Sequence, residues 1–366
     1  MPEAHSSGNQ IFTLAQVKRL SVFDTYLCIE TVQFARTGCC AGGEWSYLWG
    51  MGKSEKLYIP QPANFSFSEC VWYLDRGYDD CGHRVRNGSL LKALRLEGKD
   101  LLVEIKEGDG CLEVAILHGR ADERTRELLV AYVREWLDMD CDLAPFYTLL
   151  GRDKRLAYMC GEYMGLRLVG IVDVFEALVW SITGQQINLP FAFMLKRRLV
   201  EKYGTSFIYN GETFYIFPDC EALAAASVED LRLMQFSRSK AAYLVGLADA
   251  FAKGEQSREK LMALPDRKSR LQALMKMKGI GVWTANYCLM KSLRDPSGIP
   301  HGDTGLMTAL TKHKIIKERT ELSKIERFFS KYKGWESYMV FYFWRSLSEK
   351  PVRVADQSLQ RTATVG

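Results

Sequence analysis

The chain has 366 residues, of which 47% are hydrophobic and 25% are charged, and its formal net charge is +5. This is the composition of an ordinary globular protein with room for two or three domains, and it excludes a disordered or low-complexity chain. The small positive charge is compatible with a nucleic-acid partner but does not establish one.

The two ends are expected to be tails, because residues 1–10 are polar and residues 349–366 follow the last helical pattern. No signal segment opens the chain, and the longest apolar runs, such as Tyr338 to Trp344, are too short to span a bilayer. An intracellular, cytoplasmic protein without membrane contact is therefore expected. The ten cysteines show no CxxC spacing, which argues against a zinc site or a disulfide scaffold.

Residues 11–119 are predicted to form an antiparallel β-rich domain. The runs TYLCIETVQF (25–34), EWSYLWGM (44–51), KLYIP (56–60) and FSECVWYL (67–74) are rich in β-branched and aromatic residues and are separated by Gly or Pro. The clearest hairpin is LLVEIKEGDGCLEVAILHG, where Gly108-Asp109-Gly110 turns the chain between two alternating runs.

After residue 120 the hydrophobic period becomes helical. DERTRELLVAYVREWL places Leu128, Leu129, Tyr132 and Trp136 on one stripe, and helical patterns continue to about residue 348. A small hairpin with an Asn210-Gly211 turn interrupts them. Predicted helix starts are Asp173, in capping-box spacing with Glu176, and then Asn188, Ser227, Ser237 and Asp266.

The stretch with the clearest chemical meaning begins at Lys278-Gly279-Ile280-Gly281, between one predicted helix and the next. Glycines in a tight turn let another backbone approach closely, and the following helix presents unpaired N–H groups that attract phosphate. Downstream, the segment IPHGDTGL places Asp303 at the start of a further helix.

These segments resemble a known family. KGIGVWTANYCLM (278–290) looks like the helix-hairpin-helix of DNA glycosylases, and IPHGDTGL matches the loop and aspartate that follow it there. GLRLVGIVDVFEALVWSITGQQIN (165–188) is similar to a segment of 3-methyladenine DNA glycosylase II, and WESYMVFYFWRSL (335–347) resembles its closing aromatic helix. The resemblance covers most of residues 12–348.

The resemblance implies an α+β fold with an antiparallel β-rich amino-terminal domain followed by a two-lobed, all-α helix-hairpin-helix glycosylase core. One helical lobe would comprise residues 120–185 and 300–348, and the helix-hairpin-helix lobe residues 186–299. The active cleft would lie between the two lobes.

The resemblance also implies roles for individual residues. Asp303 would be the catalytic carboxylate, which stabilises an oxocarbenium-like transition state and orients the attacking water. Trp283, Tyr287 and Trp344 would form the base pocket. Trp283 stands where relatives that also cut the strand carry a nucleophilic lysine, so a monofunctional enzyme is expected.

The DNA contacts are assigned in the same way. In the turn at Gln185-Gln186, one of the two glutamines would fill the gap left by the flipped base. The sequence does not decide between Gln185 and Gln186. No cofactor is required, a monomer is expected, and a structural monovalent cation is expected at the hairpin. The hairpin glycines Gly279 and Gly281 are proposed to contact DNA, and the carbonyls proposed for the cation are those of Met275, Met277 and Ile280. Lys240 and Lys312 are proposed as phosphate contacts because they lie in locally basic stretches, not because of the resemblance.

The predicted function is excision of alkylated purines of the 3-methyladenine type from duplex DNA, as the first step of base-excision repair. One alternative is an oxidised-guanine (8-oxoguanine) glycosylase, which normally carries the lysine that Trp283 replaces. Another is a non-catalytic helix-hairpin-helix DNA-binding protein, against which the intact Asp303 counts. An unrelated helical scaffold would require all the segment matches to be coincidence.

Overall fold

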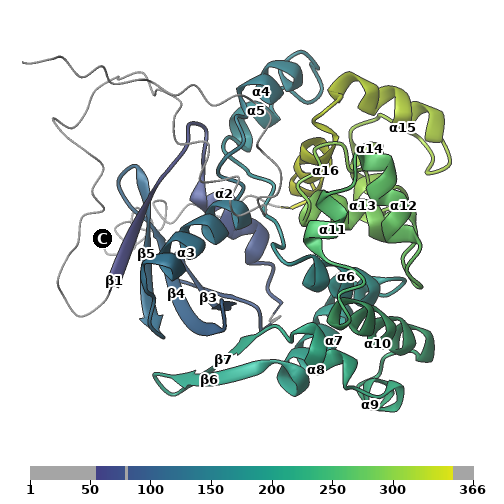
Figure 1. Cartoon of the computed structure of the whole chain (residues 1–366). Helices are drawn as coiled ribbons and strands as arrows, with labels where there is room; N and C mark the ends of the chain where they lie inside the picture. The colour runs from purple at the N-terminus through teal and green to yellow at the C-terminus, as the bar shows by residue number, and fades with distance from the viewer. Residues whose placement is uncertain (1–54, 79–80, 349–366) are drawn as a thin grey trace, which may run out of the picture. The chain divides into compact units, whose positions relative to one another are not determined.

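A five-stranded antiparallel sheet forms the amino-terminal part of the computed structural model, which describes residues 55–78 and 81–348 (Figure 1). The strand order is β1-β5-β4-β3-β2, and every neighbouring pair is antiparallel. The strands are β1 (Glu55–Pro60), β2 (Arg84–Arg86), β3 (Ser89–Leu96), β4 (Lys99–Glu107) and β5 (Cys111–His118). The predicted antiparallel sheet is confirmed; the runs at 25–34 and 44–51 and both expected tails lie outside the described residues.

The hairpin between β4 and β5 is the one predicted from its alternating pattern. The backbone N–H of Gly108 donates to the carbonyl of Cys111 (2.9 Å) across the turn, and Gly110 has a positive φ of 66°. Along β5, Leu112, Val114 and Ile116 are buried while the residues between them are half-buried. This period of two is what places one face of the sheet on a core.

The prediction of a strand at residues 67–74 is wrong, because this run forms the helix α2 (Phe67–Leu74). The hydroxyl of Ser66 accepts the N–H of Glu69 (3.2 Å) and caps the helix, and Phe67 and Cys70 are buried one turn apart. Glu69 also forms a buried ion pair with Arg345, whose Nε lies 2.6 Å from the carboxylate. Cap and packing therefore outweigh the β propensity of the aromatic residues.

Helices make up most of the remaining chain. The side chains of Asp173, Asn188, Ser227, Ser237 and Asp266 each accept a backbone N–H at a helix start, which confirms the predicted starts. The helices are α3 (Glu123–Trp136), α4 (Ala144–Leu150), α5 (Met159–Glu162), α6 (Val174–Gly184), α7 (Leu189–Tyr203), α8 (Cys220–Ala224), α9 (Val228–Leu233), α10 (Arg238–Ala252), α11 (Arg258–Met262), α12 (Arg267–Met275), α13 (Val282–Lys291), α14 (Thr304–Lys312), α15 (Leu322–Phe329), the 3-10 turn η1 (Ser330–Tyr332) and α16 (Glu336–Arg345).

Two large hydrophobic cores organise these elements. The first joins the sheet to α2–α5 and α14–α16, and the second joins α6–α12, with α13 contributing to both. Val174, Leu178 and Ile182 of α6 are buried in the second core, so the two hydrophobic cores divide near residue 173. The lobe boundary expected at residue 185 stays a prediction. The β-rich domain and the first helical lobe also share one core and do not form separate ones.

A second, two-stranded sheet links the helices to the first sheet. Its strands are β6 (Thr205–Tyr209) and β7 (Glu212–Ile216), and the predicted turn residues Asn210 and Gly211 have the positive φ values (50° and 78°) of a tight hairpin. Phe214 and Ile216 pack against Leu91 and Leu102 of the large sheet. Within the described residues, no helix is long and apolar enough to cross a membrane.

Candidate active site

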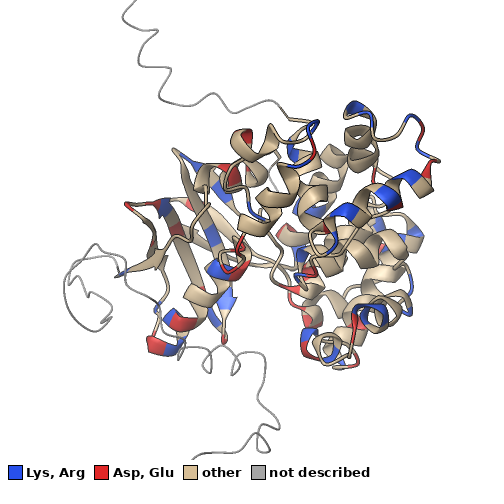
Figure 2. Ribbon diagram, turned by 90° about the horizontal axis from the view of Figure 1, so that it is seen from above, with Lys and Arg blue, Asp and Glu red and all other residues tan. Residues whose placement is uncertain are grey.

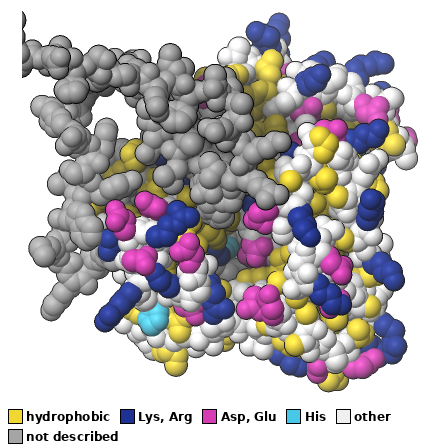
Figure 3. All heavy atoms as spheres, in the orientation of Figure 1, with side chains coloured by type: hydrophobic (Ala, Val, Ile, Leu, Met, Phe, Trp, Pro, Cys, Tyr) yellow, Lys and Arg dark blue, Asp and Glu magenta, His cyan; other side chains and the backbone are white. Residues whose placement is uncertain are grey.

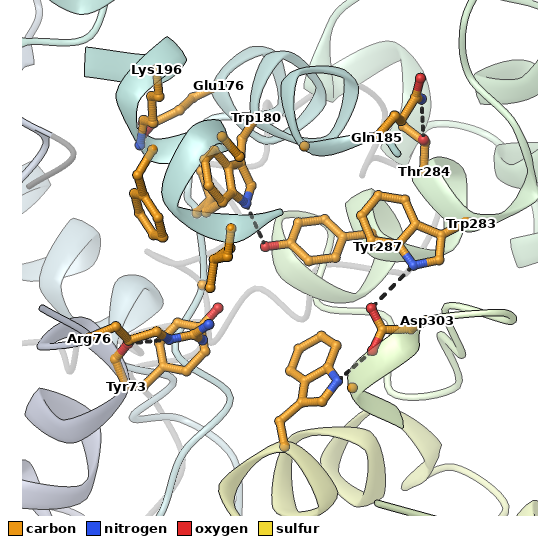
Figure 4. A pocket seen from close by; sticks show the side chains of 18 of the residues that line it. Tyr73, Arg76, Glu176, Trp180, Gln185, Lys196, Trp283, Thr284, Tyr287 and Asp303 are labelled. Atoms are coloured by element: carbon orange, nitrogen blue, oxygen red, sulfur yellow. Dashed lines mark hydrogen bonds and ion pairs between the residues drawn. The ribbon is translucent and has the colours of Figure 1, made fainter. Parts of the chain in front are cut away.

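A cavity of about 1080 Å³ opens between α2 and α3 on one side and α6, α13, α14 and α16 on the other. Its lining contains all four residues predicted for catalysis and base binding, namely Trp283, Tyr287, Asp303 and Trp344. The volume exceeds what a single purine needs, so the space admits a nucleotide turned out of a duplex. Figure 4 shows the side chains that face this space.

Asp303 is held by three donors. Its Oδ1 accepts the N–H of Leu306 (2.7 Å), which makes it the N-cap of α14, and it also accepts the indole Nε1–H of Trp344 (2.9 Å). The Nε1–H of Trp283 lies farther away, 3.4 Å from Oδ2 (Figure 4). Capping the helix and facing the cavity are therefore compatible, because Oδ1 carries the strong bonds and Oδ2 has one long contact.

The absence of a side chain at Gly305 leaves room for the contact between Asp303 and Trp344. A Cβ at this position would lie 3.2 Å from Oδ1 of Asp303 and 3.2 Å from Cδ1 of Trp344. Gly302, just before the aspartate, has a φ of +83°, a conformation that favours glycine. Glycine at positions 302 and 305 thus suits the backbone turn before Asp303 and the space that its carboxylate needs.

Three aromatic rings line the cavity beside the carboxylate. Trp283 and Tyr287 come from successive turns of α13 and stack with ring centroids 5.3 Å apart and planes 20° apart. Trp344 of α16 lies 6.5 Å from Tyr287 in a tilted arrangement. Burial raises the pKa of Tyr287 well above its ordinary value, so its ring stays neutral and electron-rich. Such faces suit stacking with a base.

Trp180, Tyr73 and Arg76 were not identified from the sequence but line the same cavity. The indole Nε1–H of Trp180 in α6 donates to the hydroxyl of Tyr287 (3.1 Å). Tyr73 lies in the last turn of α2, and the guanidinium of Arg76 lies 4.0 Å above its ring centroid. Helical spacing in FSECVWYL, with Phe67, Cys70 and Leu74 on one side, is the signal that could have identified this helix in place of the predicted strand.

Lys291 is fully buried and is not among the residues that line the cavity with Asp303. Its ammonium donates to the carbonyl of Val169 and lies 4.1 Å from the ring centroid of Tyr73. Burial lowers its pKa to about 8. Of the two lysines close in sequence to position 283, Lys278 and Lys291, the second is therefore fixed in the core, and Trp283 occupies the position itself.

The turn between α6 and α7 distinguishes its two glutamines. Gln185 donates through Nε2 to the carbonyl of Gly279 (2.8 Å) and to the hydroxyl of Thr284 (2.9 Å), so it is bound to the helix-hairpin-helix. Gln186 is exposed and has a φ of +54°. Only Gln186 has a side chain free of these contacts.

The two lysines predicted to contact DNA are engaged with the protein. Lys240 Nζ donates to the carbonyls of Thr183 (2.8 Å) and Gln185 (2.6 Å), so it completes the end of α6 and fixes the glutamine turn. Lys312 Nζ donates to the carbonyl of Ser346 (2.5 Å), just after α16. Both ammonium groups therefore position elements of the site, which sequence alone did not indicate.

The two hairpin glycines have different surroundings. A Cβ on Gly279, whose φ is +84°, would lie 2.4 Å from the ring of Tyr243, so the protein itself requires glycine there. A Cβ on Gly281 would meet nothing within 4 Å. Gly281 precedes α13 directly and leaves its first N–H groups accessible.

Basic side chains are distributed over the protein. Figure 2 shows Lys and Arg on both the sheet and the helices, and Figure 3 shows them spread along the side formed by α10, α12 and α15. The segment from Lys312 to Lys333, with eight Lys or Arg and three Glu, includes α15. Its Lys324 pairs with Glu321 (2.5 Å), so part of this charge is locally balanced.

The comparisons with known proteins agree with this geometry. The model of the HhH-GPD superfamily of base excision DNA repair proteins matches residues 179–334, and that of the AlkA N-terminal domain matches residues 64–173. A DNA-3-methyladenine glycosylase of Bacillus subtilis (strain 168) is 35% identical over 297 residues, which is 80% of this chain and 98% of that relative.

Two solved structures show the same fold. A 3-methyladenine DNA glycosylase from Archaeoglobus fulgidus has a TM-score of 0.69 at 23% identity and covers 78% of this chain and 97% of its own. A Clostridium acetobutylicum 8-oxoguanine glycosylase/lyase has a TM-score of 0.60 at 22% identity, and the match covers 80% of this chain and 98% of that one. The family and the α+β fold expected from sequence are confirmed, and this chain belongs to the DNA-3-methyladenine glycosylases of the HhH-GPD superfamily.

Proposed function

We propose that this enzyme excises alkylated purines from duplex DNA by hydrolysis of the N-glycosidic bond and leaves an abasic site. The observation that carries the proposal is the carboxylate of Asp303, held at the edge of an aromatic-lined cavity. The bond from sugar to base breaks through an oxocarbenium-like transition state, which a fixed anion stabilises. The similar enzymes named for 3-methyladenine support the same substrate class.

Asp303 would act through Oδ2, because Oδ1 is already bonded to Leu306 and Trp344. The developing positive charge on the sugar would face Oδ2, and the attacking water would donate to the same oxygen. The two indole N–H groups hold the carboxylate in place, so little reorganisation is needed when charge develops.

The aromatic rings would receive the flipped base. Stacking against the faces of Trp283, Tyr287 and Trp344 replaces the stacking that the base loses when it leaves the duplex. A cationic alkylated base gains a further cation–π attraction of roughly 0.5 to 2 kcal/mol for each good contact. Because no amine stands at position 283, the reaction would end at the abasic site without strand cleavage.

The surrounding turns would hold the distorted DNA. Gln186, exposed at the turn after α6, would enter the gap left by the base, since Gln185 is already bonded to the hairpin. A phosphate would approach the start of α13 over Gly281, where a side chain would obstruct it.

The cation proposed for the hairpin would be held by the carbonyls of Met275, Met277 and Ile280. The donor set suits a monovalent ion, because neutral carbonyl oxygens are its typical ligands. The Met277 carbonyl already accepts the N–H of Ile280 (3.2 Å) and has a second lone pair. Bound there, the ion would supply positive charge for a DNA phosphate. A monomer acting on intracellular DNA completes the proposal.

The test is single-turnover base release from duplex oligonucleotides that carry 7-methylguanine, hypoxanthine or 8-oxoguanine, with strand breaks scored before and after alkali. We expect release of the alkylated base, loss of release in Asp303→Asn, and breaks only after alkali. Tight duplex binding without release from any lesion would instead indicate a DNA-binding protein. Breaks before alkali on the 8-oxoguanine duplex would indicate a glycosylase/lyase.

A further inference from the structure

Arg76 reaches the active-site cavity from the amino-terminal part of the chain. It follows α2 by two residues, lines the cavity, and together with Tyr73 lies across it from Asp303 and Trp283 (Figure 4). The side of the cavity opposite the carboxylate is thus built partly by the region that matches the AlkA N-terminal domain. That region contributes to the site as well as to the core.

The guanidinium of Arg76 has a fixed orientation, but not all of its N–H groups donate a hydrogen bond. Its Nε–H donates to the carbonyl of Tyr73 (3.0 Å), and its carbon lies 4.0 Å above the ring of the same residue. These two contacts fix the plane of the group. Within the described ranges, no hydrogen bond or ion pair engages Nη1 or Nη2. Four N–H donors in a planar fork therefore remain available to a ligand.

The other cations that line the cavity are already bonded. Lys196 pairs with Glu176 (3.0 Å), and Lys92 donates to the carbonyl of Gly82 (2.9 Å). Arg76 differs from both because its charge faces the cavity without an acidic partner among the described residues. Arg76 can therefore bind a ligand, whereas Lys196 and Lys92 stabilise the fold.

The surroundings of Tyr73 report a positive potential at this end of the cavity. Buried Lys291 lies 4.1 Å from the ring centroid of Tyr73, close to Arg76 as well. Burial alone would raise the pKa of Tyr73, but the charges of Lys291 and Arg76 lower it to about 8. A base that carries its own positive charge is disfavoured here, whereas a neutral base with acceptor atoms is favoured.

A planar pair of N–H donors matches one edge of a purine. Arginine binds O6 and N7 of a 6-oxopurine in a bidentate manner, and this pairing discriminates strongly among bases. With the sugar at Asp303, the 6-substituent of a flipped purine lies on the side of the cavity away from that carboxylate. A 7-methylated purine has lost the N7 acceptor and is cationic, so it fails both requirements.

We propose that Arg76 is a specificity-determining residue that binds the O6/N7 edge of the flipped base and raises excision of neutral 6-oxopurines, such as hypoxanthine, relative to cationic 7-alkylpurines. The proposal rests on the glycosylase function proposed above. Under this proposal the aromatic rings bind both kinds of purine, and the Arg76 side chain determines which of the two is excised faster.

The experiment measures single-turnover excision of hypoxanthine and of 7-methylguanine from otherwise identical duplexes, for the intact protein, Arg76→Met and Arg76→Lys. We expect the hypoxanthine to 7-methylguanine rate ratio to fall at least about tenfold in Arg76→Met. Arg76→Lys, which keeps the charge but not the fork, should restore only part of it. The matched control is Lys92→Met, which removes another cation of the cavity and should leave the ratio unchanged.

A ratio is insensitive to a general loss of folding, which lowers both rates together. An equal fall of both rates in Arg76→Met would therefore overturn the specificity role and assign Arg76 to the structure of α2. A second measurement needs no variant: free hypoxanthine should inhibit the intact enzyme about tenfold better than 7-deazahypoxanthine, which lacks the N7 acceptor. Equal inhibition would also overturn the proposal.

The two proposals fail in different ways. If the intact protein releases a damaged base and the ratio does not respond to Arg76, only the role of Arg76 is lost. If the intact protein releases neither base, the glycosylase function is overturned, and the role of Arg76 is overturned with it.

Discussion

The two sides of the active-site cavity differ in how far their polar groups are satisfied. On the catalytic side, formed by Trp283, Asp303 and Trp344, the carboxylate already receives two indole N–H groups and a backbone N–H. On the recognition side, formed by Tyr73 and Arg76 with Lys291 behind them, a planar set of donors faces the cavity without acceptors. In the proposed mechanism, the group that would perform the chemistry is fixed in advance, and the group that would recognise the base keeps unused donors.

The largest expected effect tests the catalytic side. Asp303→Asn keeps an oxygen for the helix cap but removes the negative charge, so single-turnover base release should fall at least about a hundredfold, or about 2.7 kcal/mol. Binding to an abasic-site duplex should be retained, which separates lost chemistry from lost folding. A rate within a factor of about three of the intact protein would remove Asp303 from the reaction.

The next effect tests the recognition side through its buried cation. In the folded protein the pKa of Lys291 is lowered to about 8 from 10.5, so between these pH values the unfolded chain binds more protons. The free energy of unfolding should therefore rise by about 3 kcal/mol as the pH increases through this window, and be lowest below pH 8.

Tyr73 contributes in the same direction, since its pKa is also lowered to about 8. Lys291→Met removes the first effect and weakens the second, because Tyr73 then loses one of its two adjacent charges and keeps that of Arg76. Denaturant unfolding across this pH range would measure the slope in both proteins. A slope that is equal in the two proteins would contradict the assigned burial cost.

A smaller effect concerns the indole that holds Asp303. Trp344→Phe keeps an aromatic ring but removes the Nε1–H that donates to Oδ1 at 2.9 Å. A hydrogen bond to a charged group contributes about 1.5 kcal/mol, so the rate of base release should fall about tenfold. Trp335→Phe is the matched control, since Trp335 lies against Phe146 and Tyr338 in the core and does not line the cavity. Equal losses in both variants would point to packing.

The smallest effect concerns Gly305. The Cβ of Gly305→Ala would lie 3.2 Å from Oδ1 of Asp303 and from Cδ1 of Trp344, so these groups must shift by a few tenths of an ångström. The rate should fall about threefold, while stability should be unchanged or rise by up to about 1 kcal/mol because alanine favours a helix. Thermal unfolding beside single-turnover kinetics would show this divergence. A fall in both would mean that the helix start itself is strained.

Sequence reasoning found one side of the cavity and missed the other. Asp303, Trp283 and Tyr287 belong to one local pattern, a hairpin helix followed by a capped helix, and such patterns are legible along the chain. Tyr73 belongs to a run of aromatic residues that favours strands by composition, and Arg76 follows that run. Its helical form depends on the Ser66 cap and on the ion pair between Glu69 and distant Arg345.

The roles of individual polar residues also depend on tertiary contacts. Lys240 has the charge of a phosphate ligand, yet its ammonium completes the end of α6. The two adjacent glutamines are equivalent in sequence, but only Gln185 bonds to the hairpin. In both cases the partner is a backbone carbonyl or hydroxyl far along the chain, which no local pattern encodes.

The hairpin β6–β7 has a mechanical consequence. It leaves the second core and packs Phe214 and Ile216 on the large sheet, while Arg84 and Arg86 of β2 pair with Glu212 (2.5 Å). The two cores that border the cavity are thus braced against each other at a point away from the chemistry. We expect such a brace to keep the mouth of the cavity at a constant width, so that the bending required for base flipping is taken up by the DNA.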